Sequence, residues 1–479
     1  MPQVRTRFAP SPTGEIHVGN LRVAVFNHLF ARRHDGAFVL RIEDTDAERT
    51  VEGSLGRLQA DLSWAGIAWD EGPDIGGPFE PYVQSQRQPR HSERAAELLS
   101  AGLAYRCFCG EDTPETEIRD SRQSRGCAGG CRNLSPDQAS ARAAARSTPP
   151  ALRFAVPDSI VHIMDYVRGS IRCAGKDISD FIILRRDGRA TYNFAAVVDD
   201  ADMKITHVIR GAGHLSNTPK QALLFDALGS NRPVFAHLPT VLTPDGVKLS
   251  KRTGAPGVGI LRKDGLHPEG VVNYLSLLGW SPRDDTEVFS REELVERLDL
   301  DGVGSSNTSF DPDKMRWMSA QHIARMSLAD LSAAVEPFID SGRFPLGGFN
   351  LPLAVDAVRS RLHAFGEING ALALLFPLDE ALERARGQLA TEGEQILALL
   401  NSVRARIGLL EPWSVEGVTV AIREAGKELG LRGPAVFHPL RLALCGDRSG
   451  PDLGKVMAAV GRERVAGRLT EAIARLSAG

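Results

Sequence analysis

The first 70 residues alternate between two hydrophobic periodicities. Residues 3–8 and 38–42 have the length and character of strands, whereas apolar positions recur at helical spacing over 17–34 and again over 50–66. Strand–helix–strand–helix at this spacing predicts an α/β fold, a parallel sheet with helices packed on its faces. Because such sheets bind ligands at the carboxyl ends of their strands, we expect one crevice over the segments that follow the two strands, 10–20 and 43–46.

The pattern changes after these elements. Residues 84–190 contain four closely spaced cysteines, polar loops and a helix expected over 136–147, which indicates an inserted module. The start of that helix, SPDQ, has Ser135 at the N-cap, proline next and glutamine at the third helical position, which is the arrangement of a capping box. Strand-like segments resume at 191–198 and 206–210, as though the first sheet continued. The last third of the chain is almost entirely helix-patterned.

Length and composition narrow the class of protein. A chain of 479 residues should divide into about three to five domains. No apolar run approaches the roughly 20 residues of a membrane span, and the N-terminus lacks the apolar core of a secretion signal. Six cysteines do not indicate a disulfide framework, so we expect a cytoplasmic protein with reduced thiols. The net charge of −3 argues against a uniformly basic surface but permits local basic patches that bind nucleic acid.

The segment APSPTGEIHVGN, which begins at Ala9, joins the first strand to the first helix. Pro10 and Pro12 remove backbone donors and make a rigid turn, while the glycines permit close approach of a ligand. His17 lies in the first turn of the helix, whose N–H groups and positive dipole end suit phosphate. Two interpretations remain open on these residues alone: the histidine donates to phosphate oxygens in a transition state, or it only caps the helix.

A second motif, KLSKR, lies in a polar loop over 244–254. Two lysines and an arginine around a serine, in a glycine-bounded loop, suit a polyphosphate leaving group. A solvated basic loop is the ordinary alternative, and this motif by itself does not separate the two interpretations.

Together the two motifs resemble the paired signatures of class I aminoacyl-tRNA synthetases, HIGH for HVGN and KMSKS for KLSKR. The surrounding sequence is similar to bacterial glutamyl-tRNA synthetases in order and spacing, through RFAPSPTGEIHVGN, RIEDTDAER, YNFAAVVDD, THVIRG, HLSNTPKQ and VKLSKRTG. The resemblance continues through VVNYLSLLGWS, SFDPDKMRWM, HPLRLALCG and GRERVAGRL, so it covers essentially the whole chain.

The resemblance implies a division into domains. A Rossmann-type catalytic domain would occupy 1–83 and 191–240, interrupted by an acceptor-stem and zinc-binding module at 84–190. A stem-contact domain that carries the KLSKR loop would follow at 241–318, and an all-α anticodon-binding region would complete the chain at 319–479.

The resemblance also implies a reaction. The carboxylate of L-glutamate attacks the α-phosphate of ATP, which gives glutamyl-adenylate and pyrophosphate, and the glutamyl group then passes to the terminal ribose of tRNA. Positioning and charge stabilisation dominate such chemistry. Mg²⁺ is expected with the ATP. The implied partner is tRNA(Glu), with tRNA(Gln) an open alternative, and the protein is expected to be a monomer that binds no membrane.

Individual residues inherit roles in ATP and tRNA binding from the resemblance. His17, Lys248 and Lys251 would act on the phosphates as catalytic residues. The wider ATP-binding set adds Gly19, Asn20, His214 and Ser250. Arg49 would contact tRNA.

The glutamate pocket needs cations for carboxylates and an anion for the ammonium group. Arg7 and Arg210 match the arginines of the family, since a guanidinium grips a carboxylate bidentately, and Glu43 matches the acidic residue. The remaining pocket residues are Ala9, Ser11 and Tyr192. Ordinary ion pairs and structural hydroxyls are the alternatives for these side chains.

The chain departs from the pattern of the family in two places. Many members carry an acidic pair after IRG, where this chain has Ala212 and Gly213, and that affects local ATP or loop contacts. Ala196 stands where some members have an asparagine that touches the substrate, although others have an apolar residue there.

The cysteines of the inserted module form two close pairs, CFC and CAGGC. Four thiolates suffice for a tetrahedral structural zinc site, and many bacterial members of the family bind zinc in this insertion. Reduced thiols without a metal are the alternative. The four candidate ligands are Cys107, Cys109, Cys127 and Cys131.

The helical C-terminal region is the least specific part of the sequence. A protein-interaction module is the alternative to anticodon binding, and GRERVAGRL places three arginines on one helix, most simply as a solvated face. A truncated paralogue that glutamylates a tRNA base lacks this region, and glutaminyl-tRNA synthetases end in β-barrels, so the helices disfavour both. A synthetase-like RNA binder without catalysis is disfavoured by the joint presence of His17, Lys248, Lys251, Arg7 and Glu43.

Overall fold

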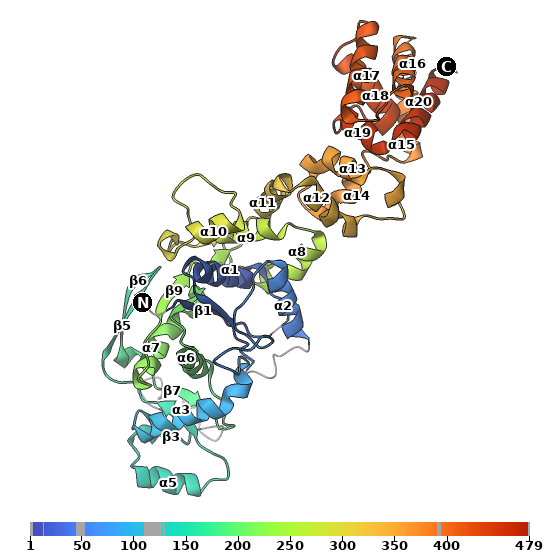
Figure 1. The fold of residues 1–479 in the computed structure, drawn as a ribbon. Helices are drawn as coiled ribbons and strands as arrows, with labels where there is room; N and C mark the ends of the chain where they lie inside the picture. Colours follow the sequence, from blue (N-terminus) through green and yellow to red (C-terminus); the bar gives the residue numbers. More distant parts are fainter. Residues whose placement is uncertain are drawn as a thin grey trace. The chain divides into compact units, whose positions relative to one another are not determined.

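The structure is a computed structural model that describes residues 3–12, 14–44, 53–109, 127, 130–389 and 394–477. The chain forms two compact units (Figure 1). The first, the catalytic unit, comprises Met1–Ile260 with Val272–Pro312, and the second, the helical unit, comprises Leu261–Val271 with Asp313–Gly479. Within the described ranges no helix is both long and apolar enough to cross a membrane.

A parallel pair of strands opens the catalytic unit. β1 (Arg5–Phe8) pairs with β2 (Ala37–Leu40), and α1 (Val18–Arg33) connects them. All four residues of β2 are buried, and α1 buries an apolar stripe beside β1. α2 (Ser54–Trp64) follows. These elements confirm the predicted strand–helix–strand–helix order, with ends that differ from the sequence pattern by a few residues.

Four further strands lie side by side in the order β8 (His207–Gly211), β9 (Val234–Leu238), β5 (Ile160–Asp165) and β6 (Gly169–Ala174). β9 is parallel to both of its neighbours, whereas β5 and β6 form an antiparallel hairpin, so the sheet is mixed. β1 lies beside β8, because the backbone N–H of Thr206 donates to the carbonyl of Arg5 at 3.0 Å. The segment over 206–210 therefore forms a strand, as its pattern predicted, and this strand lies beside the pair β1–β2 in a sheet of its own.

The expectation of a strand over 191–198 is wrong. These residues begin α6 (Tyr192–Asp202), whose residues from Phe194 to Asp200 are all buried. A helix that is buried all round carries no helical periodicity, so the run TYNFAAVV cannot be told from a buried strand by pattern. The helix carries two consecutive carboxylates, Asp199 and Asp200, into the interior.

The inserted stretch contains a small antiparallel sheet of β3 (Ala104–Cys107), β4 (Ala151–Phe154) and β7 (Phe181–Leu184). The helix expected over 136–147 is α5 (Pro136–Ala144), and Ser135 forms the predicted capping box with Gln138. β5 and β6 lie within the same stretch of sequence but pair with β9. The other helical segments are η2 (Gln84–Arg87), α3 (Gln88–Ser100), η3 (Cys131–Asn133) and η4 (Gly175–Asp177).

The rest of the catalytic unit surrounds the KLSKR loop. η5 (Ala212–Asn217) and α7 (Thr218–Ala227) connect β8 to β9. β10 (Val241–Leu242) pairs in parallel with β11 (Thr308–Ser309), and the loop between β10 and η6 (Lys251–Thr253) carries the motif. The following helices are α8 (Val258–Asp264), α9 (Pro268–Leu277), α10 (Arg291–Arg297) and η7 (Leu300–Gly302). The end of α8 and the start of α9 belong to the helical unit.

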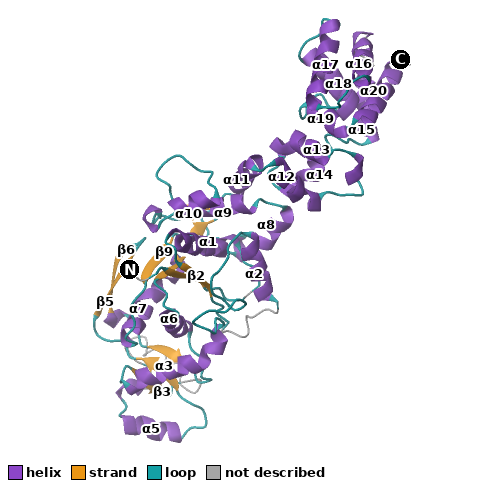
Figure 2. Cartoon of the chain, in the orientation of Figure 1, coloured by secondary structure: helices purple, strands orange, loops and turns teal. Residues whose placement is uncertain are grey.

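The described part of the helical unit contains only helices and loops, as the sequence predicted (Figure 2). One apolar core runs through it and includes Leu372, Leu400, Ile422, Leu440 and Leu469, all without exposed surface. Its longer helices are α11 (Pro312–Arg325), α12 (Leu328–Val335), α13 (Leu351–Val358), α14 (Ile368–Leu372), α15 (Asp379–Leu389), α16 (Glu394–Gly408), α17 (Val415–Glu428), α18 (Pro434–Cys445), α19 (Leu453–Val460) and α20 (Arg462–Ser477). Its short 3-10 turns are η8 (Glu336–Phe338), η9 (Leu346–Gly348), η10 (Arg359–Arg361) and η11 (Phe365–Glu367).

Candidate active site

A cavity of about 490 Å³ opens at the carboxyl ends of β1 and β8, beside the start of α1. The segments after β1 and β2 meet there, since the backbone N–H of Glu43 donates to the carbonyl of Pro10 at 3.0 Å. This confirms the predicted crevice for Glu43, whereas Asp44 does not line it and residues 45–46 and Arg49 lie outside the described residues. The lining includes Arg7, Ala9, Ser11, His17, Gly19, Asn20, Glu43, Tyr192, Arg210, His214 and Lys248.

His17 is the N-cap residue of α1. Its Nδ1 accepts a hydrogen bond from the backbone N–H of Gly19 at 3.1 Å, so a neutral ring carries its proton on Nε2. Gly19 is required here, because a Cβ on it would lie 2.9 Å from Cε1 of His17. His17 therefore caps the helix, and the same contact fixes its ring at the edge of the cavity.

The KLSKR loop returns to the start of α1. The carbonyl of Pro256 accepts from the N–H of Val18 at 3.2 Å, and the N–H of Val258 donates to the carbonyl of Ile16 at 2.8 Å. These two bonds clamp the segment after the loop against the turn that holds His17. Two motifs about 230 positions apart in sequence thus border the same cavity.

The residues of the KLSKR motif differ in whether they line the cavity. Lys248 lines the cavity, whereas Ser250 does not and instead interacts through its hydroxyl with that of Thr253 at 3.1 Å. Lys251 begins η6, and only its backbone is described. A Cβ on Gly213 would lie 3.1 Å from Nζ of Lys248, so the departure from the acidic pair of the family adjoins this lysine.

A buried layer of alternating charges lies under the cavity. Asp200 accepts from Nε of Arg7 at 3.2 Å and from Nη1 of Arg41 at 2.6 Å, and Nη2 of Arg41 donates to Glu43 at 2.9 Å. Burial alone would raise the pKa of Asp200, but the charges of Arg41 and Arg7 outweigh it and hold the pKa below its ordinary value. Burial raises the pKa of Glu43, and Arg41 opposes that shift. This layer fixes the direction of Arg7.

Asp199, the neighbour of Asp200 on α6, anchors the helix from its other side. It accepts from Nε of Arg87 at 2.6 Å and from the amide of Gln84 at 2.7 Å, and its Oδ1 lies 2.8 Å from Nε2 of His91. Sequence analysis missed both carboxylates and Arg41. The only local signal was a pair of aspartates at the end of an apolar run, which is unusual for a buried segment.

Arg210, at the end of β8, has no carboxylate within 4 Å among the described residues. Its Nε donates to Nε2 of His237 at 3.0 Å and its Nη2 to the hydroxyl of Thr218 at 2.9 Å. Burial lowers its pKa, although a guanidinium stays charged near neutral pH. Near it, the hydroxyl of Tyr192 lies 3.2 Å from Nδ1 of His214. The floor of the cavity therefore holds a buried cation that forms no ion pair within 4 Å among the described residues. Ala196, also on α6, is buried and does not line the cavity.

The four predicted metal ligands converge. The sulfurs of Cys107, Cys109, Cys127 and Cys131 all lie within 4.8 Å of one another, and those of Cys109 and Cys131 are 3.8 Å apart. Tetrahedral zinc with Zn–S bonds of about 2.3 Å spaces its sulfurs about 3.8 Å apart. Nε of Arg153 donates to Sγ of Cys107, and the backbone N–H of Cys131 donates to Sγ of Cys127, both at 3.3 Å. The cluster has the geometry and the donors of a thiolate metal site.

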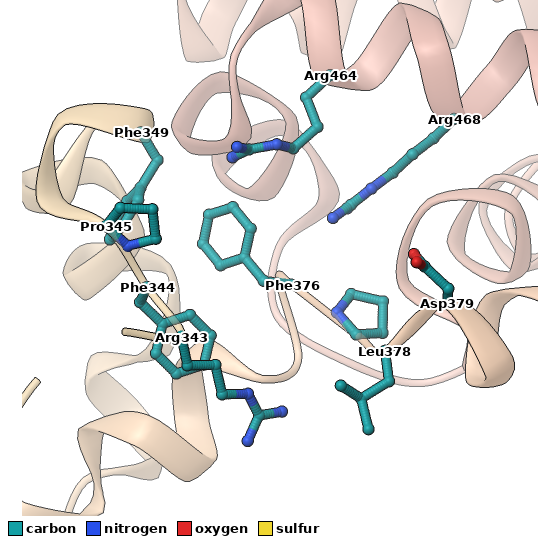
Figure 3. Close-up of a pocket in the computed structure, with 10 residues that line it drawn as sticks. Arg343, Phe344, Pro345, Phe349, Phe376, Leu378, Asp379, Arg464 and Arg468 are labelled. Atoms are coloured by element: carbon teal, nitrogen blue, oxygen red, sulfur yellow. The ribbon is translucent and has the colours of Figure 1, made fainter. Parts of the chain in front are cut away.

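The helical unit has a separate cavity of about 280 Å³ around Phe376 (Figure 3). Arg464 and Arg468 approach the ring from α20, with guanidinium carbons 5.3 and 6.0 Å from its centre. Arg468 is buried and donates to the carbonyls of Leu375 and Leu444 at 2.8 and 2.7 Å. The expectation of a solvated arginine face is therefore wrong for Arg468, which ties α20 to its neighbours.

Comparisons with known proteins define the class. Residues 3–317 match the family described as tRNA synthetases class I (E and Q), catalytic domain, and residues 327–473 match an anticodon binding domain. The fold, the paired motifs and the cavity are therefore those of a class I tRNA synthetase.

Individual relatives narrow this class. The chain is 41% identical to a glutamate–tRNA ligase of Sulfurihydrogenibium sp. over 97% of its own length and 98% of the relative's. It is 42% identical to the corresponding ligase of Desulforudis audaxviator, over 100% of this chain and 98% of that protein. A crystal structure of a glutamate tRNA ligase from Elizabethkingia meningosepticum, in complex with its amino acid, matches with a TM-score of 0.82 at 30% identity, over 99% of this chain and 100% of that one. The chain belongs to the glutamate–tRNA ligase family.

Proposed function

We propose that the protein activates L-glutamate with ATP and transfers the glutamyl group to the 3′ end of tRNA. The observation that carries this proposal is one shared cavity, in which the start of a helix, a lysine from the KLSKR loop and a buried arginine with no ion pair within 4 Å among the described residues come together. The first step joins the carboxylate to the α-phosphate and releases pyrophosphate. The second step passes the acyl group to a ribose hydroxyl and releases AMP.

Glutamate binding follows from the charges of the cavity. Arg210 is buried with no carboxylate within 4 Å among the described residues, which is unfavourable until a substrate carboxylate arrives. Arg7 is the second cation, and its guanidinium is held in place by Asp200. Glu43 supplies the anion for the substrate ammonium group, and the charge of the bound ammonium favours its ionised form. Further pocket contacts come from Ala9, Ser11 and Tyr192.

ATP binding uses the other end of the cavity. The backbone N–H groups at the start of α1 and the positive end of its dipole suit the triphosphate, and glycine at position 19 lets it approach closely. His17 donates from Nε2 to the phosphate oxygens on which negative charge develops, and Lys248 with Lys251 neutralises the departing pyrophosphate. Mg²⁺ arrives with ATP as part of the substrate. The remaining proposed ATP contacts are Asn20, His214 and Ser250.

We infer that the four-cysteine cluster holds one structural zinc ion. The sulfur spacing fits tetrahedral coordination, and the N–H donors to sulfur stabilise thiolates. Zinc there would hold β3 and η3 together, in the part of the chain where the resemblance expects contacts with the acceptor stem. The metal is structural in this proposal and takes no part in either reaction step.

The proposal also covers the tRNA partner, the cellular compartment and the oligomeric state of the enzyme. The helical unit and Arg49 would contact tRNA, with tRNA(Glu) as the substrate and tRNA(Gln) as the alternative. None of the six cysteines, all within the described residues, forms a disulfide, which supports a reducing compartment such as the cytoplasm. The enzyme is proposed to act as a monomer.

Aminoacylation of purified tRNA(Glu) and tRNA(Gln) with labelled glutamate tests the function and the choice of tRNA together. We expect charging of tRNA(Glu), and pyrophosphate exchange that depends on glutamate and is measured with tRNA present. A folded, metal-loaded protein that binds tRNA and yet shows neither activity would instead be a non-catalytic RNA binder.

A further inference from the structure

A buried chain of three side chains lies behind Arg210. Oδ2 of Asp165 lies 2.5 Å from Nδ1 of His237, and Nε2 of His237 lies 3.0 Å from Nε of Arg210. Asp165 ends β5, His237 lies in β9 and Arg210 lies in β8, so three adjacent strands each contribute one member. Asp165, His237 and Arg210 have exposed fractions of 1%, 0% and 6%, and only Arg210 reaches the cavity.

The hydrogen bonds fix where the proton of His237 resides. Arginine can only donate, so Nε2 of His237 must present its lone pair to Nε–H of Arg210. The proton of the neutral ring therefore sits on Nδ1 and points at Asp165. Asp165 is suited to accept it, because it also accepts from the backbone N–H groups of Arg168 at 2.8 Å and Val167 at 3.0 Å. These bonds favour the ionised carboxylate.

We propose that His237, held in its Nδ1-protonated form by Asp165, is a positioning residue that aims the guanidinium of Arg210 at a carboxylate of the bound amino acid. The inference rests on the proposed function, in which Arg210 binds glutamate. Arg210 has a flexible stem, and immobilising such a side chain at the moment of binding weakens affinity. His237 and Thr218 engage Nε and Nη2 in advance, and no hydrogen bond from Nη1 is present among the described residues.

Two substitutions of His237 test separately the hydrogen-bond acceptor that it offers to Arg210 and the donor that it offers to Asp165. His237→Gln can place an amide oxygen near the position of Nε2 and so keep an acceptor for Arg210, whereas His237→Asn places its amide near Nδ1 and keeps only the partner of Asp165. We expect His237→Asn to raise the KM for glutamate roughly 10- to 100-fold, the scale of one lost hydrogen bond to a charged group. The KM for ATP should stay within about twofold, a change too small to reflect a lost hydrogen bond. The rise for His237→Gln should be clearly smaller.

His28→Asn is the matched control. His28 is 6% exposed on α1, packs edge-on against Phe38 and has no contact with Arg210, so the same change at a buried histidine should alter stability and leave both KM values unchanged. Equal rises for the two His237 variants, a parallel rise in the KM for ATP, or no rise for His237→Asn would each overturn the positioning role.

The tautomer gives a second measurement that needs no variant to be active. In ¹⁵N-histidine-labelled wild-type protein, with His237→Gln used to assign the signal, the His237 ring should show the Nδ1–H neutral pattern near neutral pH. A proton on Nε2, or an imidazolium, would refute the arrangement. If the wild-type protein charges no tRNA with glutamate, the proposed function fails, while the NMR result still decides whether the buried chain exists as described.

Discussion

Asp200 offers the most direct test of the buried charges under the cavity. It is 4% exposed and lies between the guanidinium groups of Arg7 and Arg41. Asp200→Asn keeps the shape of the side chain but removes the negative charge that contacts both arginines. Arg41 retains Glu43 at 2.9 Å and Asp199 at 4.0 Å, whereas Arg7 keeps no ion pair within 4 Å among the described residues.

The expected loss of stability follows from the burial of these charges. Removing one partner of a buried ion pair costs about 3–5 kcal/mol, because the remaining charge stays desolvated. The catalytic unit has about 300 residues, so its entropy of unfolding is near 0.6 kcal/mol/K and the melting temperature should fall by about 5–8 °C. The KM for glutamate should also rise, since Arg7 is no longer held in place.

The contribution of Asp200 to stability should depend on pH, and the direction of its pKa shift gives the sign of that dependence. The folded-state pKa of Asp200 lies below its ordinary value, so its contribution to stability is present above a pH of about 4 and is lost as pH falls through the folded-state pKa. The difference in unfolding free energy between wild type and Asp200→Asn should be full at pH 7 and should shrink below about pH 4.

Denaturant unfolding at several pH values measures this difference. Asp226→Asn is the matched control, because Asp226 forms an ion pair with Arg232 at the surface and its side chain is 50% exposed. Its loss should cost no more than about 1 kcal/mol. A cost below about 1 kcal/mol for Asp200→Asn, or an equal cost at pH 3 and pH 7, would refute the assignment of a buried ionised carboxylate.

Three further predictions concern His17, the cysteines and His28. His17→Ala should slow adenylate formation by about 10²–10³-fold. His17→Asn, in which asparagine is a good N-cap residue, should restore the stability of the protein without restoring this rate. Full recovery of the rate in His17→Asn would mean that His17 only caps the helix. Metal analysis should find about one zinc per chain in wild type and none after the double change Cys107→Ser and Cys127→Ser; unchanged metal content would place the ion elsewhere. Burial, with the charges of nearby arginines, lowers the pKa of His28 to about 3, so the unfolded chain takes up a proton that the folded chain does not. When the pH falls from 7 to 5, the unfolding free energy of wild type should therefore decrease by about 2 kcal/mol more than that of His28→Asn. Parallel plots of unfolding free energy against pH for the two proteins would show that His28 titrates normally.

The amino-acid sequence determined the local elements and the chemical signatures. The spacing of apolar residues and the length of apolar runs identified β1, α1 and the helical unit. The capping box at Ser135 and the turn before His17 were also legible, since their contacts span only a few positions. Two motifs at the ends of the catalytic stretch sufficed to indicate a class I synthetase.

The tertiary structure alone decided how these parts support one another. α6 was indistinguishable from a strand because it is buried all round, and burial on every side removes periodicity. The bonds of Asp200 to Arg41 and of His237 to Asp165 join residues 159 and 72 positions apart, and nothing in either local stretch specifies its partner. We expected Arg468 to lie on a solvated face for the same reason, because the carbonyls that it contacts belong to Leu375 and Leu444, outside its own helix. Chemistry carried by residue type was readable from the sequence, whereas the buried charges that orient it appear only when distant segments are packed together.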